Sequence, residues 1–541
     1  IAALVLLVAC ANIANLLLAR GMGRKAEMSI RSALGAGRAR IVRQLLTESV
    51  VLAGLGGLLG LGVSYLGARM LLLLAFPGQQ GVPIDAAPSL LVIGFAFALS
   101  VATGVVFGIA PAWMAARTQP ADALRSNART TAQGATLLQR GLVVLQAALS
   151  LVLLVAAGLF AQSLSKLENS NMKLDARNRY IIHINPQAAG YATTQVEPLY
   201  RTIVDRFHAL PGVVKVGLST YTPMEENNWS TGVKLQGEPD PNKGSSWVKG
   251  TPEYFDAVGT HVIMGRGFRE QDTLNAPPVA VVNQEFVRQF LKGKNPIGRR
   301  FGYPFPGEDA AYEIVGVVED TTYTSVYWKN HAMYFVPMTQ WPWVHGKPGG
   351  GEHAKIENDL SMYAGAIVVQ TERPVPDMEA LALKTLSGIN SNLTVVKFQT
   401  FQEQINDRFT EERMIARLTS LFGGLALLLA ALGLYGVTAY TVARRTQEIG
   451  IRMALGAERA SVVTMVMRGA LLQALVGLAL GVPVAMLCVR YVKSQLYEIT
   501  SVNLTVMAAA VGTLAVAALV AGLIPARRAA SIDPMKALRV E

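Results

Sequence analysis

The sequence predicts an α-helical multi-pass membrane protein with a mixed α/β extracytoplasmic domain inserted into it. Three observations lead to this fold class. Apolar runs long enough to cross a bilayer recur along the chain, about 250 residues of ordinary soluble composition separate the fourth run from the fifth, and one polar motif occurs twice.

The composition excludes an ordinary soluble protein. Hydrophobic residues make up 51% of the 541 residues, the mean hydropathy is +0.33, and only 16% are charged, against about a quarter in soluble domains. The net charge of +12 comes from basic residues that flank the apolar runs, so we expect membrane lipids and no nucleic acid as partners. Cys10 and Cys488 both lie in apolar runs, which excludes a disulfide framework in the soluble part.

Seven apolar runs approach the roughly 20 residues that a spanning helix needs. They must be helices, because lipid cannot satisfy irregular backbone. The chain opens inside the first run, so we expect one further span and a further outer domain upstream of Ile1. The seven runs are residues 1–19, 49–74, 89–114, 138–163, 416–440, 469–492 and 502–524.

Lys and Arg alternate between the loops. The segments after the first, third, fifth and seventh runs are rich in Arg, whereas residues 76–88 contain no Lys or Arg. By the positive-inside rule, the Arg-rich loops and the C-terminus are predicted to be cytoplasmic, and residues 164–412 extracytoplasmic.

The insert is predicted to be mixed α/β, with a helical stalk at its end. Thr400 and Glu403 form a capping-box pattern, and we expect the helix that they open to continue into the fifth span. Its six histidines show no ligand spacing beyond the pair His345 and His353, which we interpret as solvated surface, so no metal site is expected. The predicted strands are residues 180–184, 213–218, 279–282, 312–318, 333–336, 366–370 and 393–398, and the predicted helices are 196–210, 284–291 and 377–389.

The internal repeat is the strongest signal in the sequence. The pattern Glu-x-x-Ile-Arg-x-Ala-Leu-Gly-Ala begins at Glu27 and again at Glu448. Each copy then carries a GxxxG pair inside a span, where small residues allow close helix packing. These pairs are Gly56 with Gly60 and Gly477 with Gly481. Each copy closes on a Pro-Ala segment, at Pro111 and at Pro525.

The repeat defines the predicted domains. Residues 1–125 form a first unit with three spans, 126–137 a cytoplasmic linker, 138–163 the leading span of the second unit, 164–412 the outer domain with stalk helices, and 413–541 the rest of the second unit, with three spans.

The repeated motif places a charged turn at the membrane edge, beside a short amphipathic stretch. One interpretation is a docking site for a cytoplasmic partner. The other is a Glu–Arg pair four residues apart on a helix that lies on lipid headgroups. Spacing alone leaves both open.

The sequence resembles the FtsX/MacB-type permeases of ABC transporters, in a duplicated form, and its insert resembles the MacB-type periplasmic core domain. Besides the two repeated motifs, five segments carry this resemblance. They are Thr251-Pro-Glu-Tyr-Phe-Asp-Ala-Val-Gly259, Gly265-Arg-Gly-Phe268, Val282-Asn-Gln-Glu-Phe286, Asn295-Pro-Ile-Gly298 and Ile314-Val-Gly-Val-Val318.

The resemblance implies that the motif is a coupling segment that meets a cytoplasmic ABC ATPase, which favours docking over the lipid interpretation. It also implies a bacterial cytoplasmic (inner) membrane location, pairing of the two units, and a periplasmic adaptor or other outer partner. The implied docking residues are Glu27, Arg31, Leu34, Gly35 and Ala36 in the first copy and Glu448, Arg452, Leu455, Gly456 and Ala457 in the second.

The predicted function is that of an ABC permease working by mechanotransmission, which exports or extracts an amphiphile, lipoprotein or peptide. The alternative is a non-transporting relay that regulates an outer partner such as a cell-wall hydrolase. The chain has no Gly-x-x-x-x-Gly-Lys-Ser/Thr loop and no His-Glu-x-x-His motif, so we expect no enzyme, no cofactor and a separate ATPase. No Asp, Glu, Lys or His lies at mid-span, which argues against an ion-coupled carrier.

Overall fold

The structure is a computed structural model of the 541-residue chain, and it divides into two compact units. Residues 1–166 with 411–541 form a membrane unit, and residues 167–410 form a soluble unit. The described residues are 1–23, 31, 37–75, 87–116, 129–225, 227–305, 307–328, 331–340, 343–344, 347–348, 360–492, 496–497, 499 and 503–532.

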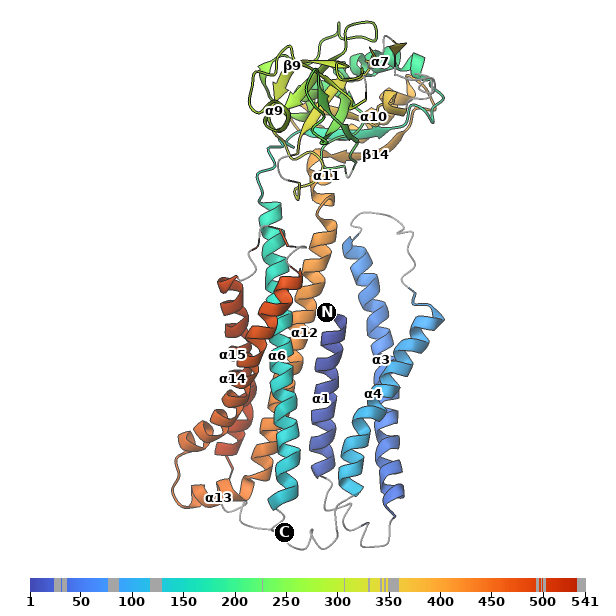
Figure 1. The fold of residues 1–541 in the computed structure, drawn as a ribbon. Helices are drawn as coiled ribbons and strands as arrows, with labels where there is room; N and C mark the ends of the chain where they lie inside the picture. Colours follow the sequence, from blue (N-terminus) through green and yellow to red (C-terminus); the bar gives the residue numbers. More distant parts are fainter. Residues whose placement is uncertain are drawn as a thin grey trace. The chain divides into compact units, whose positions relative to one another are not determined.

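The membrane unit consists of long helices (Figure 1). Among the described residues, six helices are long and apolar enough to cross a membrane, and the first predicted span appears as a shorter apolar segment, Ala2–Leu18, within α1. The helices are α1 (Ala2–Gly23), α3 (Arg38–Ala75), α4 (Leu90–Ala116), α6 (Arg129–Glu168), α12 (Thr410–Arg444), α13 (Thr446–Ala454), α14 (Arg459–Val492) and α15 (Leu504–Ala530).

Helix α6 is the most enclosed of the six, with 56% of its most apolar window buried. Three helices contact it closely. The Ser150 hydroxyl donates to the Ala426 carbonyl of α12 at 2.9 Å, and a Cβ at Gly158 would lie 2.6 Å from Val506 of α15. A Cβ at Gly477 of α14 would lie 2.6 Å from the Cβ of Ala147. α6 is therefore the centre of the second copy.

The soluble unit is built on a mixed sheet in the order β14-β1-β13-β2-β5-β10-β7-β9-β8-β4, with β3 paired to β5 and β6 paired to β9. The pairs β10–β5 and β7–β9 are parallel. The strands in the sheet are β1 (Arg179–Ile184), β2 (Val213–Ser219), β3 (Ser230–Gly232), β4 (Lys234–Leu235), β5 (Gly244–Gly250), β6 (Val262–Gly265), β7 (Val279–Asn283), β8 (Arg300–Gly302), β9 (Tyr312–Val318), β10 (Met333–Pro337), β13 (Ala366–Thr371) and β14 (Val395–Thr400).

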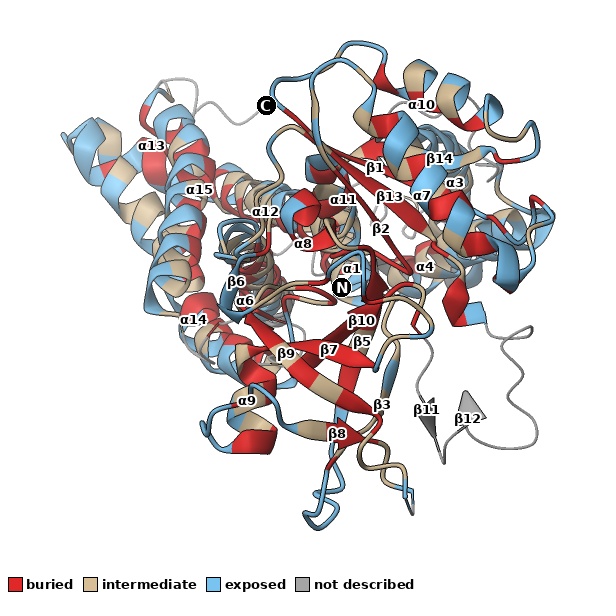
Figure 2. Cartoon of the chain, turned by 90° about the horizontal axis from the view of Figure 1, so that it is seen from above, coloured by how far each residue is buried: buried red, intermediate tan, exposed pale blue. Residues whose placement is uncertain are grey.

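Two hydrophobic cores lie along this sheet (Figure 2). The first joins β1, β13 and β2 to α7 (Val196–His208) and α10 (Met378–Ser387). The second joins β7, β9 and β10 to α9 (Gln284–Leu291). A single register pair, Ser219 with Gly250, joins β2 to β5 between them. The mixed α/β class predicted for the insert is confirmed.

The predicted continuous stalk helix is wrong in detail. The capping box at Thr400 and Glu403 is present and opens α11 (Phe401–Asp407), but α12 begins anew at Thr410. A turn intervenes, in which the Phe409 amide donates to the carbonyl of Asn406 and the Phe409 side chain becomes buried. No Gly or Pro marks this break, so the sequence pattern did not reveal it.

Candidate functional site

Helix α13 contains the second copy of the repeated motif. Glu448 lies in its first turn and Arg452 in its last, where each charge complements the helix dipole. Glu448 Oε1 and Arg452 Nη2 are 2.8 Å apart, and both side chains are about half exposed. A pair of this kind adds only about 0.3–0.5 kcal/mol, so the burial of other residues must hold α13 in place.

Ile449 provides that burial. It is fully enclosed in a cluster with Val442 of α12, Val462 of α14 and Ala529 of α15. The segment is thus fixed to the ends of three membrane helices through Ile449, with Met453 packed beside it, while its charged pair is about half exposed.

A glycine turn ends α13. Gly456 has φ +91°, which favours glycine. The amide of Ala457 donates to the carbonyl of Arg452 at 3.0 Å, and the amide of Gly456 donates to that of Met453 at 3.1 Å, as in a Schellman motif. The turn leaves Leu455 83% exposed, so α13 presents a large apolar side chain close to the charged pair.

The first copy is described at Arg31, whereas Glu27, Leu34, Gly35 and Ala36 lie outside the described residues. Arg31 Nη1 donates to Gln44 Oε1 at 2.8 Å. In the second copy, Arg452 Nη1 makes the same contact, 2.9 Å long, with the sulfur of Met465. Both contacts span 13 residues, so the two copies hold their arginines in equivalent positions.

The structure places the two GxxxG pairs in different surroundings. Cβ atoms at Gly477 and Gly481 would lie 2.6 Å and 3.0 Å from atoms of α6. At Gly56 and Gly60, a Cβ would meet no described atom within 4 Å. A packing role for the first pair stays a prediction.

The end of the soluble unit is anchored before the chain enters α12. Phe401 of α11 is fully buried. Gln404, 3% exposed, donates through Nε2 to Thr222 Oγ1 at 2.8 Å and to the Pro223 carbonyl at 2.7 Å. The residues just before α12 are therefore held to the segment that follows β2.

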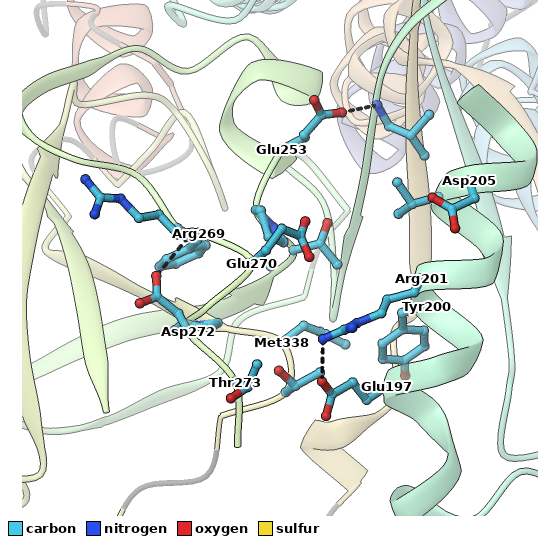
Figure 3. Close-up of a pocket in the computed structure, with 18 residues that line it drawn as sticks. Glu197, Tyr200, Arg201, Asp205, Glu253, Arg269, Glu270, Asp272, Thr273 and Met338 are labelled. Atoms are coloured by element: carbon cyan, nitrogen blue, oxygen red, sulfur yellow. Dashed lines mark hydrogen bonds and ion pairs between the residues drawn. The ribbon is translucent and has the colours of Figure 1, made fainter. Parts of the chain in front are cut away.

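The soluble unit also contains a pocket of about 200 Å³ (Figure 3). Tyr200 and Arg201 of α7 line it on one side, and Glu270 and Asp272 lie across from them. Drug-sized ligands occupy about 300–1,000 Å³, so this pocket suits a side chain or a small part of a larger ligand. Its lining comes from several separate segments, and for that reason no local motif revealed it.

Charge in the pocket is largely paired internally. Arg201 contacts Glu197 at 3.0 Å. Burial alone would raise the pKa of Glu253, but hydrogen bonds from Lys215 and His208 outweigh it and hold the pKa below its ordinary value. Among the described residues, no group of three or more His, Cys, Asp or Glu side chains could hold a metal ion; His345 and His353 lie outside the described residues.

Two family models match the chain. The model of the FtsX-like permease C-terminal region matches residues 1–120 and again 420–534. The model of the MacB-like periplasmic core domain matches residues 141–383.

Individual relatives match over shorter stretches. The chain is 41% identical over 126 residues to the pyoverdine export ATP-binding/permease protein PvdT of Pseudomonas fluorescens, covering 23% of this chain and 18% of that protein. It is 22% identical over 340 residues to the macrolide export ATP-binding/permease protein MacB of Syntrophobacter fumaroxidans, covering 54% of this chain and 47% of that protein. The chain thus spans less than half the length of these relatives.

The periplasmic region of MacB from Actinobacillus actinomycetemcomitans overlays with a TM-score of 0.29 at 14% identity, covering 44% of this chain and 98% of that structure. The family matches themselves follow the repeat and the insert, with one FtsX-like match on each side of the soluble unit. The chain therefore belongs to the FtsX-like permeases of ABC transporters and carries a MacB-like periplasmic core domain between its two FtsX-like segments.

Proposed function

We propose that this chain is the transmembrane part of an ABC-type exporter that works by mechanotransmission. A cytoplasmic ATPase, supplied as a separate subunit, docks on the two coupling segments. Its movement passes through the membrane helices to the soluble unit, which lies outside the cytoplasmic membrane. The cargo is an amphiphile, lipoprotein or peptide.

The observation that carries this proposal is the build of α13. Ile449 ties the segment to the ends of α12, α14 and α15, so movement of α13 must move those helices. Glu448, Arg452 and Leu455 remain exposed, which is the composition expected of an interface with an apolar anchor and a charged rim.

Two further facts support a cytoplasmic position of α13 and a function in export. Arg444, Arg445, Arg527 and Arg528 lie at the ends of α12 and α15 that pack on α13, in agreement with a cytoplasmic position under the positive-inside rule. The relatives PvdT and MacB are named for export of pyoverdine and macrolides, which favours export over the relay alternative.

The test is co-purification of the full-length protein with its ATPase. We expect Arg452→Glu and Leu455→Asp each to reduce the ATPase retained by about tenfold, the equivalent of about 1.4 kcal/mol of binding free energy. Arg490→Glu is the matched control, because Arg490 is an exposed arginine in the last turn of α14, at the opposite end of that helix from α13.

The permease variants should elute from size exclusion like the parent protein. Full ATPase retention by both α13 variants would rule out docking at this segment. Equal loss in the Arg490→Glu control would show that the effect is not specific to α13.

A further inference from the structure

The interior of the membrane unit contains polar side chains whose hydrogen-bonding capacity is not met. Asn12 of α1 is 6% exposed and Gln146 of α6 is 0% exposed. Within the described part of the chain, Asn12 Oδ1 and Gln146 Oε1 have no hydrogen-bond partner. Burying such a group unpaired is destabilising, so their presence at mid-helix calls for a physical reason.

Both oxygens point at one glycine of α12. A Cβ at Gly433 would lie 2.3 Å from Gln146 Oε1 and 3.3 Å from Asn12 Oδ1. The first distance is shorter than any real carbon–oxygen contact, so a methyl group at this position would displace the Gln146 carboxamide. Gln146 also reaches α1 directly, since its Nε2 donates to the Val8 carbonyl at 3.4 Å. The three helices α1, α6 and α12 therefore meet at a notch that two carboxamides fill.

The junction joins equivalent positions of the two copies of the repeat. Asn12 stands 15 residues before Glu27, and Gly433 stands 15 residues before Glu448. The two residues thus occupy equivalent positions in the two copies. One turn further along α12, a Cβ at Gly436 would lie 3.8 Å from the side chain of Leu16, which is one residue beyond the position equivalent to Gly436. Contact between equivalent positions is what a two-fold arrangement produces, so α1 and α12 cross on the approximate two-fold axis of the repeat.

We propose that Asn12, Gln146 and Gly433 form an asymmetric lock that pairs the first copy of the unit with the second copy of the same chain. Two identical copies would bring the same residue to the axis twice. Two asparagines would crowd the position that Gln146 occupies, and two glycines would leave the Gln146 carboxamide facing a gap. One asparagine against one glycine fills the notch, and rotation of the Asn12 amide brings its N–H group toward Gln146 Oε1.

The lock thus combines attraction with exclusion. Interhelical contacts of polar side chains in a membrane stabilise helix association only modestly, so the gain for the correct pairing is small. The larger effect is the penalty on wrong pairs, as in other specific helix interfaces. The partner that the lock rejects is α12 of a second copy of this chain.

The first arm of the test is a cross-link within one chain. Leu16→Cys with Gly436→Cys, in a protein where Cys10 and Cys488 are alanine, should form an intrachain disulfide. Gly433→Ala should lower its yield about fivefold or more, because the added methyl overlaps Gln146. Gly424→Ala is the matched control, since a Cβ at this other α12 glycine meets nothing within 4 Å. An unchanged yield in Gly433→Ala would overturn the lock.

The second arm measures the rejected pair and needs no added bulk. In the same protein without Cys10 and Cys488, Gly436→Cys leaves one cysteine, so a disulfide can form only between two chains. Asn12→Gly makes the two copies alike at the axis and should raise this interchain product several-fold. Ile13→Gly, at an exposed neighbour in the same helix, should not. Equal interchain yields in the parent and in Asn12→Gly would contradict the proposal, and neither arm depends on ATPase docking.

Discussion

The two copies of the permease unit agree in how they pack internally. In the first copy, a Cβ at Gly108 of α4 would lie 3.0 Å from the Cβ of Ser49 of α3. In the second, a Cβ at Gly522 of α15 would lie 3.3 Å from that of Ala470 of α14. These are equivalent residues, because each glycine stands three residues before the closing proline of its copy. The repeat therefore preserves one helix pair with one close contact.

The copies differ in what covers that helix pair. The most apolar window of α3 is 0% buried, whereas that of α14 is 33% buried. The difference lies at the GxxxG pairs, since Gly477 and Gly481 pack on α6 and the equivalent pair in α3 has no described neighbour within 4 Å. In the second copy, this pair therefore lies against the leading helix α6 rather than inside the helix pair of α14 and α15.

The largest expected difference in stability is between alanine variants of the two GxxxG pairs. Gly477→Ala with Gly481→Ala should lower the free energy of unfolding by about 2 kcal/mol or more, because the methyl groups overlap α6. Gly56→Ala with Gly60→Ala should be neutral or stabilising by up to about 1 kcal/mol, because alanine favours the helix. Detergent-solubilised protein can be compared by thermal or denaturant unfolding.

Equal destabilisation by the two double variants would contradict the difference in packing between the two GxxxG pairs. It would mean that a helix covers α3 as α6 covers α14. A control in the same bundle is Gly512→Ala in α15, where a Cβ meets nothing within 4 Å.

The sequence allowed the spans, the repeat and much of the sheet to be predicted, since each rests on a periodic pattern. Strand β5 was missed although it lies mid-sheet, because Gly-Ser-Ser-Trp-Val-Lys-Gly lacks a β-branched run. Its buried serine side chains form hydrogen bonds inside the domain; the Ser245 hydroxyl donates to the Ala332 carbonyl at 2.9 Å. This segment becomes a strand because it pairs with β10, and its own sequence does not reveal that pairing.

The candidate site likewise contains residues that the sequence reveals and contacts that it does not. Glu448, Arg452 and Gly456 could be singled out because the motif is repeated; the first two lie in α13 and Gly456 lies in the turn that follows it. The meeting of Asn12 with Gly433 could not be predicted from either span alone. It depends on which helices cross, and only tertiary packing fixes that.

An intermediate effect is expected from the contact that the copies share. Gly108→Ala should cost about 1 kcal/mol, because Ser49 Oγ and Cβ would lie 2.9 and 3.0 Å from the new methyl group. Gly522→Ala should cost less, since its nearest neighbour is the flexible side chain of Met467, at 3.2 Å. Thermal unfolding of the two variants measures the difference.

Ser49→Ala makes the first copy resemble the second at this contact. Combined with Gly108→Ala, it should recover part of the loss. If the double variant is no more stable than Gly108→Ala alone, the Ser49 side chain is not the source of the crowding.

The smallest effect on stability is expected at the coupling segment. Arg452→Ala removes an exposed pair with Glu448 and should lower the free energy of unfolding by about 0.5 kcal/mol or less, with the effect shrinking as salt rises. Arg31→Ala should be similarly mild, because its contact with Gln44 is also exposed. Unfolding measured at low and high ionic strength tests both.

A loss above about 1 kcal/mol in Arg452→Ala would make this arginine a structural residue, and its effect on ATPase retention could then come from altered folding. A small loss leaves docking as the reason for any large change in binding, and it places the function of the repeat at the exposed face of α13 rather than in the bundle that supports it.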